Sequence, residues 1–177
     1  MKRAWPWSIP ACATLGIKGL GLGKTLIIAG ITFLIDQISK WYVVEYLDLK
    51  TKYAIDVLPP FLNFRMAWNE GINFGLFANG ADTMRWVLIG LALAISIAVL
   101  CYARNFKGWL AALFLGCIVG GALGNALDRF VYGAVADFLN MSCCGFNNPF
   151  SFNVADAIIF FGAFGLIFFS EKLNKRA

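Results

Sequence analysis

Long apolar segments alternate with shorter polar ones along most of this sequence. Four of the apolar segments, at about 25–46, 84–103, 108–127 and 154–170, are long enough to form membrane-spanning helices. An α-helix needs roughly 17–25 residues to cross the about 30 Å of hydrocarbon in a bilayer. The pattern therefore predicts a membrane all-α fold, built as a bundle of four transmembrane helices.

The connection between the first two apolar segments has a different pattern. It contains FLNFRMAWNEGINFGLF, in which large and polar residues alternate around the turn-forming triplet Asn69, Glu70 and Gly71. Such alternation is typical of short strands. We expect a small β-rich extracytoplasmic segment here, between helices 1 and 2. It would either present a strand edge to an extended peptide or form a cap on the bundle.

The composition supports a membrane protein. Hydrophobic residues make up 60% of the chain and charged residues 14%, and the mean hydropathy is +0.71. An ordinary soluble domain has about 25% charged residues. The net charge of +5 does not indicate a nucleic-acid partner, because no basic stripe is interleaved with aromatic residues.

The basic residues predict the topology. Nine of the 15 gather in three groups: before the first apolar segment, at 104–107 between the second and third, and at 172–176 after the fourth. Four spans place all three groups on one side, which the positive-inside rule makes cytoplasmic. We therefore expect both termini in the cytoplasm, with residues 1–24 as a cytoplasmic tail and 25–177 as one membrane domain. The connections at about 47–83 and 128–153 then lie outside.

Polar residues in or beside the predicted spans converge on a layer in the outer half of the membrane. A rise of about 1.5 Å per residue from the cytoplasmic charges places Asp36 about 18 Å, Asp128 about 31 Å and Asp156 about 24 Å into the membrane. A charged residue at the centre of a helix costs roughly 2.5–3.5 kcal/mol. A layer of such residues in the outer half of the membrane therefore indicates a function or a compensating partner.

Asp36 and Lys40 are one such pair. They are four residues apart in DQISK, so both side chains lie on one face of a helix and can form an ion pair. This pair either stabilises the bundle or contacts a substrate.

The spacing Asn-x-x-Asp occurs twice, and it carries the remaining candidates. Asn125 and Asp128, followed by Arg129, occur in GNALDR, and Asn153 and Asp156 occur in FNVADA. An Asn one turn before a carboxylate can hold its rotamer through hydrogen bonds. For Asn153, capping of the fourth helix is the alternative role.

The residue types limit the chemistry. The chain contains no histidine, so serine and cysteine nucleophiles lack their usual base, and a zinc site lacks its usual ligands. Three carboxylates remain at the right depth, Asp128, Asp137 and Asp156. Two neighbouring carboxylates that share one proton can activate water, as in aspartic proteases. We expect no metal and no organic cofactor.

Five motifs occur in a fixed order across the four spans: DQISK, NEGINFG, GNALDR, VADF and FNVADA. In this order they resemble the bacterial lipoprotein signal peptidase, the type II signal peptidase. The resemblance covers about residues 36 to 157. It differs from the family's pattern at Asn73, where the usual residue is Ala.

This resemblance implies an aspartic endopeptidase of the bacterial inner membrane, with its active site toward the periplasmic face. It removes signal peptides from diacylglyceryl-modified prolipoproteins, cutting before the lipidated cysteine. The implied catalytic residues are Asp137 and Asp156. The implied substrate-binding or supporting residues are Asp36, Lys40, Asn69, Gly71, Asn125, Asp128, Arg129 and Asn153.

The implied partners are the diacylglyceryl-modified prolipoproteins, membrane lipid and globomycin-type inhibitors. We expect a monomer and no nucleic-acid partner. A proton-coupled small membrane carrier is the alternative, because carriers also place Asp and Lys within helices. However, the sequence shows no inverted repeat with broken helices, which carriers often have. A non-catalytic scaffold would not explain three aspartates at one depth.

Overall fold

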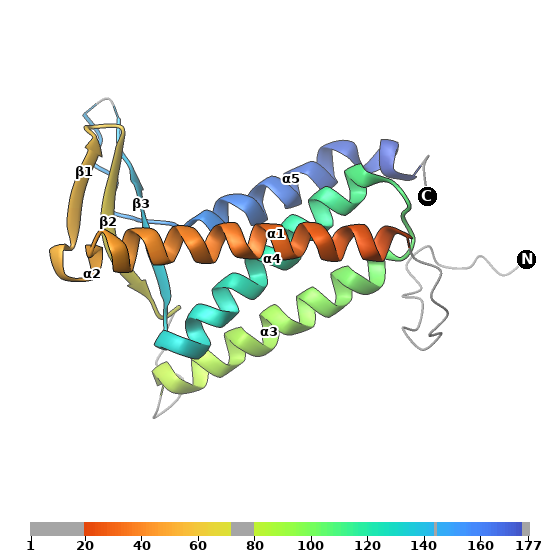
Figure 1. Cartoon of the computed structure of the whole chain (residues 1–177), viewed down its shortest axis with the longest axis horizontal. Coiled ribbons are helices and arrows are strands. Elements are labelled where there is room, and N and C mark those ends of the chain that lie inside the picture. The colour runs from red at the N-terminus through yellow and green to blue at the C-terminus, as the bar shows by residue number, and fades with distance from the viewer. Residues whose placement is uncertain (1–19, 72–79, 144, 175–177) are drawn as a thin grey trace, which may run out of the picture.

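The computed structural model describes residues 20–71, 80–143 and 145–174. Its helices and strands run in one order along the chain: α1 (Leu20–Lys40), the π-helix η1 (Trp41–Tyr46), α2 (Leu49–Lys52), β1 (Ala54–Leu58), β2 (Leu62–Asn69), α3 (Gly80–Ala103), α4 (Trp109–Tyr132), β3 (Val135–Met141) and α5 (Val154–Asn174). The four long helices form a bundle, and the strands form a sheet across one end of it (Figure 1).

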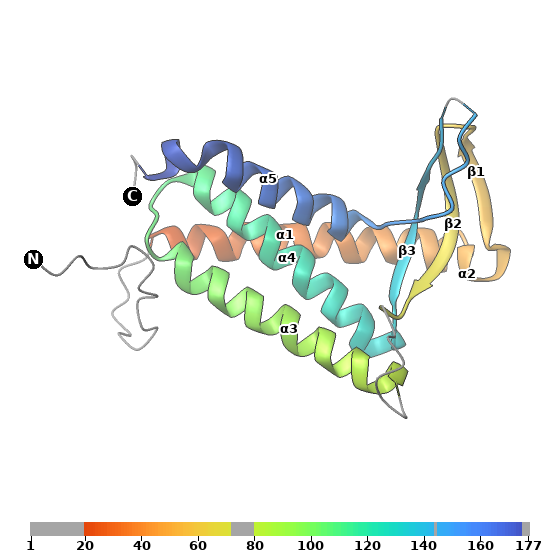
Figure 2. The same cartoon turned by 180° about the vertical axis from the view of Figure 1, so that it is seen from behind.

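Helix α4 is the centre of the bundle. It packs against α1, α3 and α5, and both views of the molecule show it between its neighbours (Figures 1 and 2). Within the described residues, three helical segments are long and apolar enough to cross a membrane: Gly21–Tyr46, Asp82–Ala103 and Trp109–Tyr132. The apolar part of α5, Val154–Phe169, is shorter. The described end of α5 and the start of α1 both lie opposite the sheet (Figure 1).

Helices α1 and α4 approach each other closely through glycine. A Cβ atom on Gly120 would lie 2.5 Å from the backbone oxygen of Ala29 and would also overlap the Thr32 hydroxyl. One turn further along α4, a Cβ atom on Gly124 would overlap the carboxylate of Asp36. Because these positions lack a side chain, the polar end of α1 fits directly against α4.

The sheet is antiparallel, in the order β1, β2, β3. At the bundle end of the β2–β3 pair, Asn69 is opposite Val135 and Ala67 is opposite Asp137. A small core of Val43, Val44, Leu49, Ala136 and Phe138 joins the sheet to η1 and α2. The predicted β-rich segment between helices 1 and 2 is confirmed, and the third strand comes from the connection between α4 and α5.

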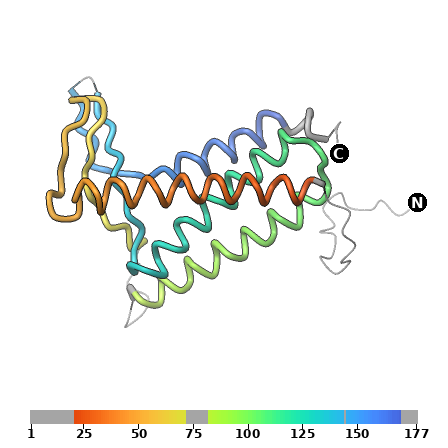
Figure 3. Tube along the Cα trace, in the orientation of Figure 1, coloured from red at the N-terminus to blue at the C-terminus, as the bar shows by residue number. Residues whose placement is uncertain are grey.

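Each of the four long helices extends beyond its predicted span at one end, by about four or five residues. Helix α4 continues to Tyr132, so Asp128 and Arg129 lie within the helix and not in the outer connection. Only beyond this end does the chain turn into β3 (Figure 3). Helix α1 begins at Leu20, before the predicted span. Residues 1–19 of the predicted tail and Asn73 of the NEGINFG motif lie outside the described residues.

Candidate active site

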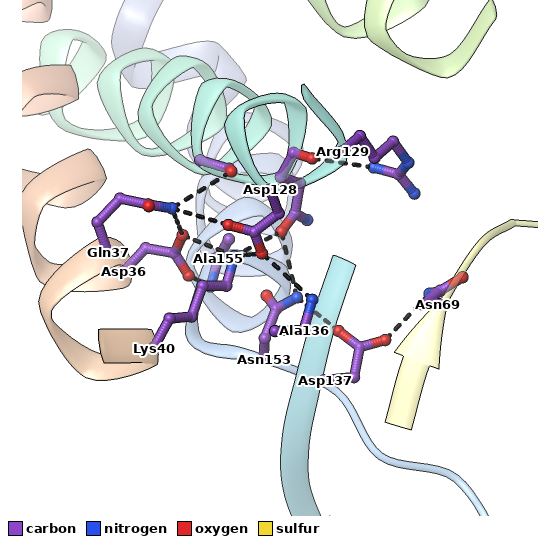
Figure 4. A network of polar contacts seen from close by, with 12 residues as sticks. Asp36, Gln37, Lys40, Asn69, Asp128, Arg129, Ala136, Asp137, Asn153 and Ala155 are labelled. Carbon is purple, nitrogen blue, oxygen red and sulfur yellow. Dashed lines mark hydrogen bonds and ion pairs between the residues drawn. The ribbon is translucent and has the colours of Figure 1, made fainter. Parts of the chain in front are cut away.

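A layer of buried polar side chains lies where the bundle meets the sheet (Figure 4). It draws on α1, α4, β3 and the start of α5, and Asn69 at the end of β2 borders it. A buried polar group is costly unless it is hydrogen-bonded, so the partners of each residue define what the layer can do.

Asp137 lies on β3 and is almost completely buried, with 3% of its surface exposed. Its carboxylate accepts hydrogen bonds from Asn69 Nδ2 at 3.0 Å and from Asn153 Nδ2 at 2.6 Å. Burial raises the pKa of Asp137 to about 6, the two amides act against this rise, and the nearby charge of Asp156 adds to it. This carboxyl group therefore binds a proton far more readily than an exposed aspartate.

Asp156 lies in the first turn of α5 and is partly exposed. Its carboxylate accepts hydrogen bonds from Asn125 Nδ2 at 2.9 Å and from the backbone N–H of Asn153 at 3.2 Å. The Asn153 side chain in turn accepts the backbone N–H of Asp156 at 2.9 Å. This reciprocal arrangement is a capping box. Asn153 thus caps α5, the alternative role considered for it. Its side-chain amide donates to Asp137 and not to the Asp156 carboxylate that the spacing had suggested.

Asn125 and Asn153 connect the two carboxylates. Asn153 Nδ2 donates to Asn125 Oδ1 at 3.1 Å, and these two amides contact Asp156 and Asp137 respectively. The hydrogen-bonded series Asp137, Asn153, Asn125, Asp156 therefore connects both acids. Two carboxylates held in this way can share a proton and activate a water molecule.

A second cluster lies behind the first. Lys40 Nζ contacts Asp36 Oδ2 and Asp128 Oδ2, each at 2.8 Å, and donates to Asn125 Oδ1 at 3.0 Å. Asp36 is 0% and Asp128 1% exposed. The predicted Asp36–Lys40 pair is therefore present, and Asp128 is its third member. Asn125 links this cluster to the pair of Asp137 and Asp156.

Two backbone groups and one side chain complete the second cluster. The N–H of Ala155 donates to Asp36 at 2.9 Å, and the N–H of Ala136 donates to Asp128 at 3.2 Å. Gln37 donates to both carboxylates at 3.1 Å. The cluster thereby ties α1 and α4 to the first residues of β3 and α5, the two elements that carry Asp137 and Asp156.

Arg129 and Gly71 lie at the edge of the site. Arg129 donates to the backbone oxygen of Asn125 at 3.3 Å, and its buried Nε has no partner among the described residues. Gly71 has a φ of 88°, a conformation that favours glycine, and its N–H donates to Asn69 Oδ1 at 3.0 Å. A Cβ atom here would lie 2.6 Å from Leu88.

The comparisons with known proteins agree on one family. The sequence model of the family described as signal peptidase (SPase) II matches residues 28–171, most of the chain. The chain belongs to the signal peptidase II family. Relatives named lipoprotein signal peptidase include one from Methylorubrum extorquens, 41% identical with 82% of this chain and 84% of the relative covered. Another, from Polynucleobacter necessarius, is 38% identical with 88% and 93% covered.

The fold agrees with this assignment. A solved structure of a bacterial membrane enzyme has a TM-score of 0.68 and 25% sequence identity, covering 82% of this chain and 91% of that one. The predicted family is confirmed, and the protein is a membrane signal peptidase. The family model and the relatives named here favour no carrier.

The structure of this signal peptidase brings the predicted site residues together. Eight of them belong to the connected clusters: Asp36, Lys40, Asn69, Asn125, Asp128, Asp137, Asn153 and Asp156. Arg129 and Gly71 join through single contacts at the edge. Their roles in catalysis and binding stay predictions. Gln37 was not predicted, although it lies within the DQISK motif. The backbone N–H groups of Ala136 and Ala155 leave no signal in the sequence.

Proposed function

We propose that this protein is an intramembrane aspartic endopeptidase with Asp137 and Asp156 as its catalytic residues. Its substrates are diacylglyceryl-modified prolipoproteins, which it cuts before the lipidated cysteine. One observation carries the proposal: two carboxylates from different elements are held by a pair of hydrogen-bonded amides, at the end of the bundle where the sheet begins.

The two carboxylates divide the chemistry between them. The raised pKa of buried Asp137 makes it the group that holds the shared proton and donates it to the scissile carbonyl oxygen. Asp156 is partly exposed and takes the proton from the attacking water. The water oxygen bonds to the carbonyl carbon, and the peptide nitrogen leaves with a proton returned by the dyad. Neither step needs a metal or an organic cofactor.

The border of the site supplies the substrate contacts. Asn69 ends β2 and Gly71 follows it in a turn, so an extended peptide beside this turn lies next to Asp137. Arg129 offers guanidinium N–H groups beyond its single backbone contact, and these can bind peptide or ester carbonyls. Asp36, Lys40 and Asp128 are positioning residues, because they act on the dyad through Asn125 and backbone groups.

The topology follows from the placement of the basic residues. We take α5 as the fourth span, with both termini in the cytoplasm and the dyad at the outer face of the inner membrane. In support, Lys24 at the start of α1 donates to the backbone oxygen of Lys107 at 2.8 Å, so two basic groups lie at the end opposite the sheet. The protein acts as a monomer, and globomycin-type inhibitors occupy the peptide site.

The experiment that tests this function is cleavage of a defined precursor by the purified protein in detergent. We expect cleavage of a diacylglyceryl-modified prolipoprotein and none of the same precursor without the lipid. Equal cleavage of both forms would remove lipid recognition from the proposal. Persistence of cleavage in Asp137→Asn would remove the aspartic mechanism.

A further inference from the structure

A cavity of about 280 Å³ lies on a side of the bundle that the proposed chemistry does not use. It is bounded by the end of α1, η1, the last turn of α4 and Ala136 of β3. Its floor is the Lys40–Asp128 ion pair, and Trp41, Glu45 and Tyr132 also line it. Asp137 and Asp156 are not among its lining residues.

The donors at the floor of this cavity are already engaged. Lys40 has three N–H bonds, and it contacts three acceptors, on Asp36, Asp128 and Asn125. Gln37 Nε2 donates to Asp36, to Asp128 and to the backbone oxygen of Gly124. An anion such as a phosphate would therefore meet carboxylates without a free donor from these two residues.

Acidic groups outnumber basic ones around the floor. One cation, Lys40, contacts two buried carboxyl groups, Asp36 and Asp128. Glu45 adds a further carboxylate to the lining, paired with the exposed Lys50. Trp41 and Tyr132 supply aromatic rings, whose faces attract cations. The cavity is therefore complementary to a small cation that donates hydrogen bonds.

The cavity is also placed for a lipid. Glu45 and Tyr132 are at or next to the last residues of two membrane-spanning segments, Gly21–Tyr46 and Trp109–Tyr132, which is the depth of lipid headgroups. In the turns of α1 that precede Trp41, three exposed side chains, Ile31, Leu34 and Ile38, lie on one face of the helix. A headgroup in the cavity would thus leave its acyl chains against this apolar stripe.

The geometry points to a binding site for a phospholipid with a primary ammonium headgroup, such as phosphatidylethanolamine, in this cavity. The ammonium group lies between Glu45 and Asp128 against the rings of Trp41 and Tyr132. The phosphate stays at the mouth of the cavity, away from the carboxylates at its floor, and the acyl chains follow α1. The site is separate from the peptide site, so it would let a resident outer-leaflet lipid stabilise the junction of α1, α4 and β3 without competing with the substrate.

Native mass spectrometry of the purified full-length protein in detergent tests this proposal. The probes are phosphatidylethanolamine and phosphatidylglycerol with identical acyl chains, titrated separately. We expect phosphatidylethanolamine to bind about tenfold more tightly, a ratio that corresponds to about 1.4 kcal/mol. The protein's net charge of +5 would by itself favour the anionic phosphatidylglycerol. Equal binding, or a preference for phosphatidylglycerol, would overturn the proposal.

Variants locate the site. Glu45→Gln and Trp41→Leu should each remove most of the preference for phosphatidylethanolamine. Lys50→Ala breaks the same ion pair as Glu45→Gln but leaves the carboxylate in place, so it should keep or strengthen the preference. Trp86→Leu removes an exposed aromatic ring on α3 and should change nothing. A preference that survives both cavity variants would place the lipid elsewhere.

A soluble competitor separates a lipid from a free amine. Phosphoethanolamine carries the same ammonium group without acyl chains, so it should displace phosphatidylethanolamine only at concentrations far above that of the lipid. Displacement at equal concentration would show that the cavity binds a free amine and would overturn the assignment to a lipid.

Discussion

The side chains of Asp137 and Asn69 contact each other across two paired strands, and this contact moderates the effect of burial on the acidity of Asp137. Burial raises the pKa of Asp137 to about 6, and the amide of Asn69, which donates to the carboxylate at 3.0 Å, limits that rise. A dyad works while it holds one proton. Its activity should therefore fall at alkaline pH, as the last proton leaves.

The first prediction concerns this alkaline limb. Asn69→Ala removes a donor that stabilises the charged form, so the pKa of Asp137 should rise and the proton should be retained to higher pH. The alkaline limb of the pH profile of kcat/KM should move to higher pH. Asn63→Ala, on the same strand, is the control and should leave the limb in place. A shift to lower pH would contradict the assignment.

Lys40 is the single cation of the buried cluster, and the second prediction concerns its loss. Lys40→Ala leaves Asp36 and Asp128 together without a counter-charge, a change that typically costs about 3–5 kcal/mol. We expect a lower Tm in detergent at neutral pH. Lys50→Ala, which breaks an exposed pair with Glu45, should change Tm little. Unchanged stability with lost cleavage would instead make Lys40 a substrate contact.

Among the elements, α1 and α4 determine whether the buried cluster forms at all. Gly120 and Gly124 let the two helices approach until Asp36 and Lys40 reach Asp128 and Asn125. This contact is formed by small residues and hydrogen bonds, as in many membrane helix pairs. This contact alone brings four predicted site residues together, Asp36, Lys40, Asn125 and Asp128, and all four lie on α1 or α4 and none in a loop.

A third prediction tests that contact. Gly120→Ala introduces a methyl group that overlaps Thr32 and the backbone of Ala29, and such overpacking typically costs about 1–3 kcal/mol. Tm should fall, and cleavage should fall with it. Gly30→Ala on α1 has open space around it and should be neutral or slightly stabilising. Equal effects of the two substitutions would show that the close approach has no energetic importance.

The sequence predicted the elements unequally, for physical reasons. Apolar length was enough to locate the long helices and alternation was enough to locate β1 and β2, because both signals are local. The end of α4 was placed too early, at 127, because Asp128 and Arg129 interrupt the apolar run. In the structure Lys40 of another helix neutralises Asp128. A hydropathy pattern is local, so it contains no information about an ion-pair partner as distant in the sequence as Lys40 is from Asp128.

Strand β3 and part of the site were beyond prediction for the same reason. Six of its seven residues pair with β2, from which α3 and α4 separate it in the chain. The residue types in the five ordered motifs predicted which side chains form the site. The backbone N–H groups of Ala136 and Ala155, however, become ligands of Asp128 and Asp36 only in the folded chain.

At the scale of the whole molecule, the sheet lies across one end of the bundle (Figure 1). Lys24, near the start of α1, and Lys107 lie together at the opposite end. A fourth prediction follows for single cysteines in a background where the native cysteines are replaced by serine. Thr51→Cys, on the exposed face of α2, should react with an impermeant thiol reagent in intact spheroplasts. Asn105→Cys, in the α3–α4 connection, should react only after lysis. Labelling of Asn105→Cys in intact cells would reverse the orientation.

The central claim is that Asp137 and Asp156 act as one unit, and single-turnover cleavage of a diacylated precursor tests it most directly. Asn is nearly isosteric with Asp, so folded variants that still bind substrate can be compared. Asp137→Asn and Asp156→Asn should each lower the rate about 10⁴-fold or more, and the double variant should be scarcely slower, as for residues that act together. Asp128→Asn should lose less activity. Substantial turnover by either single variant, or full loss confined to Asp128→Asn, would contradict the account.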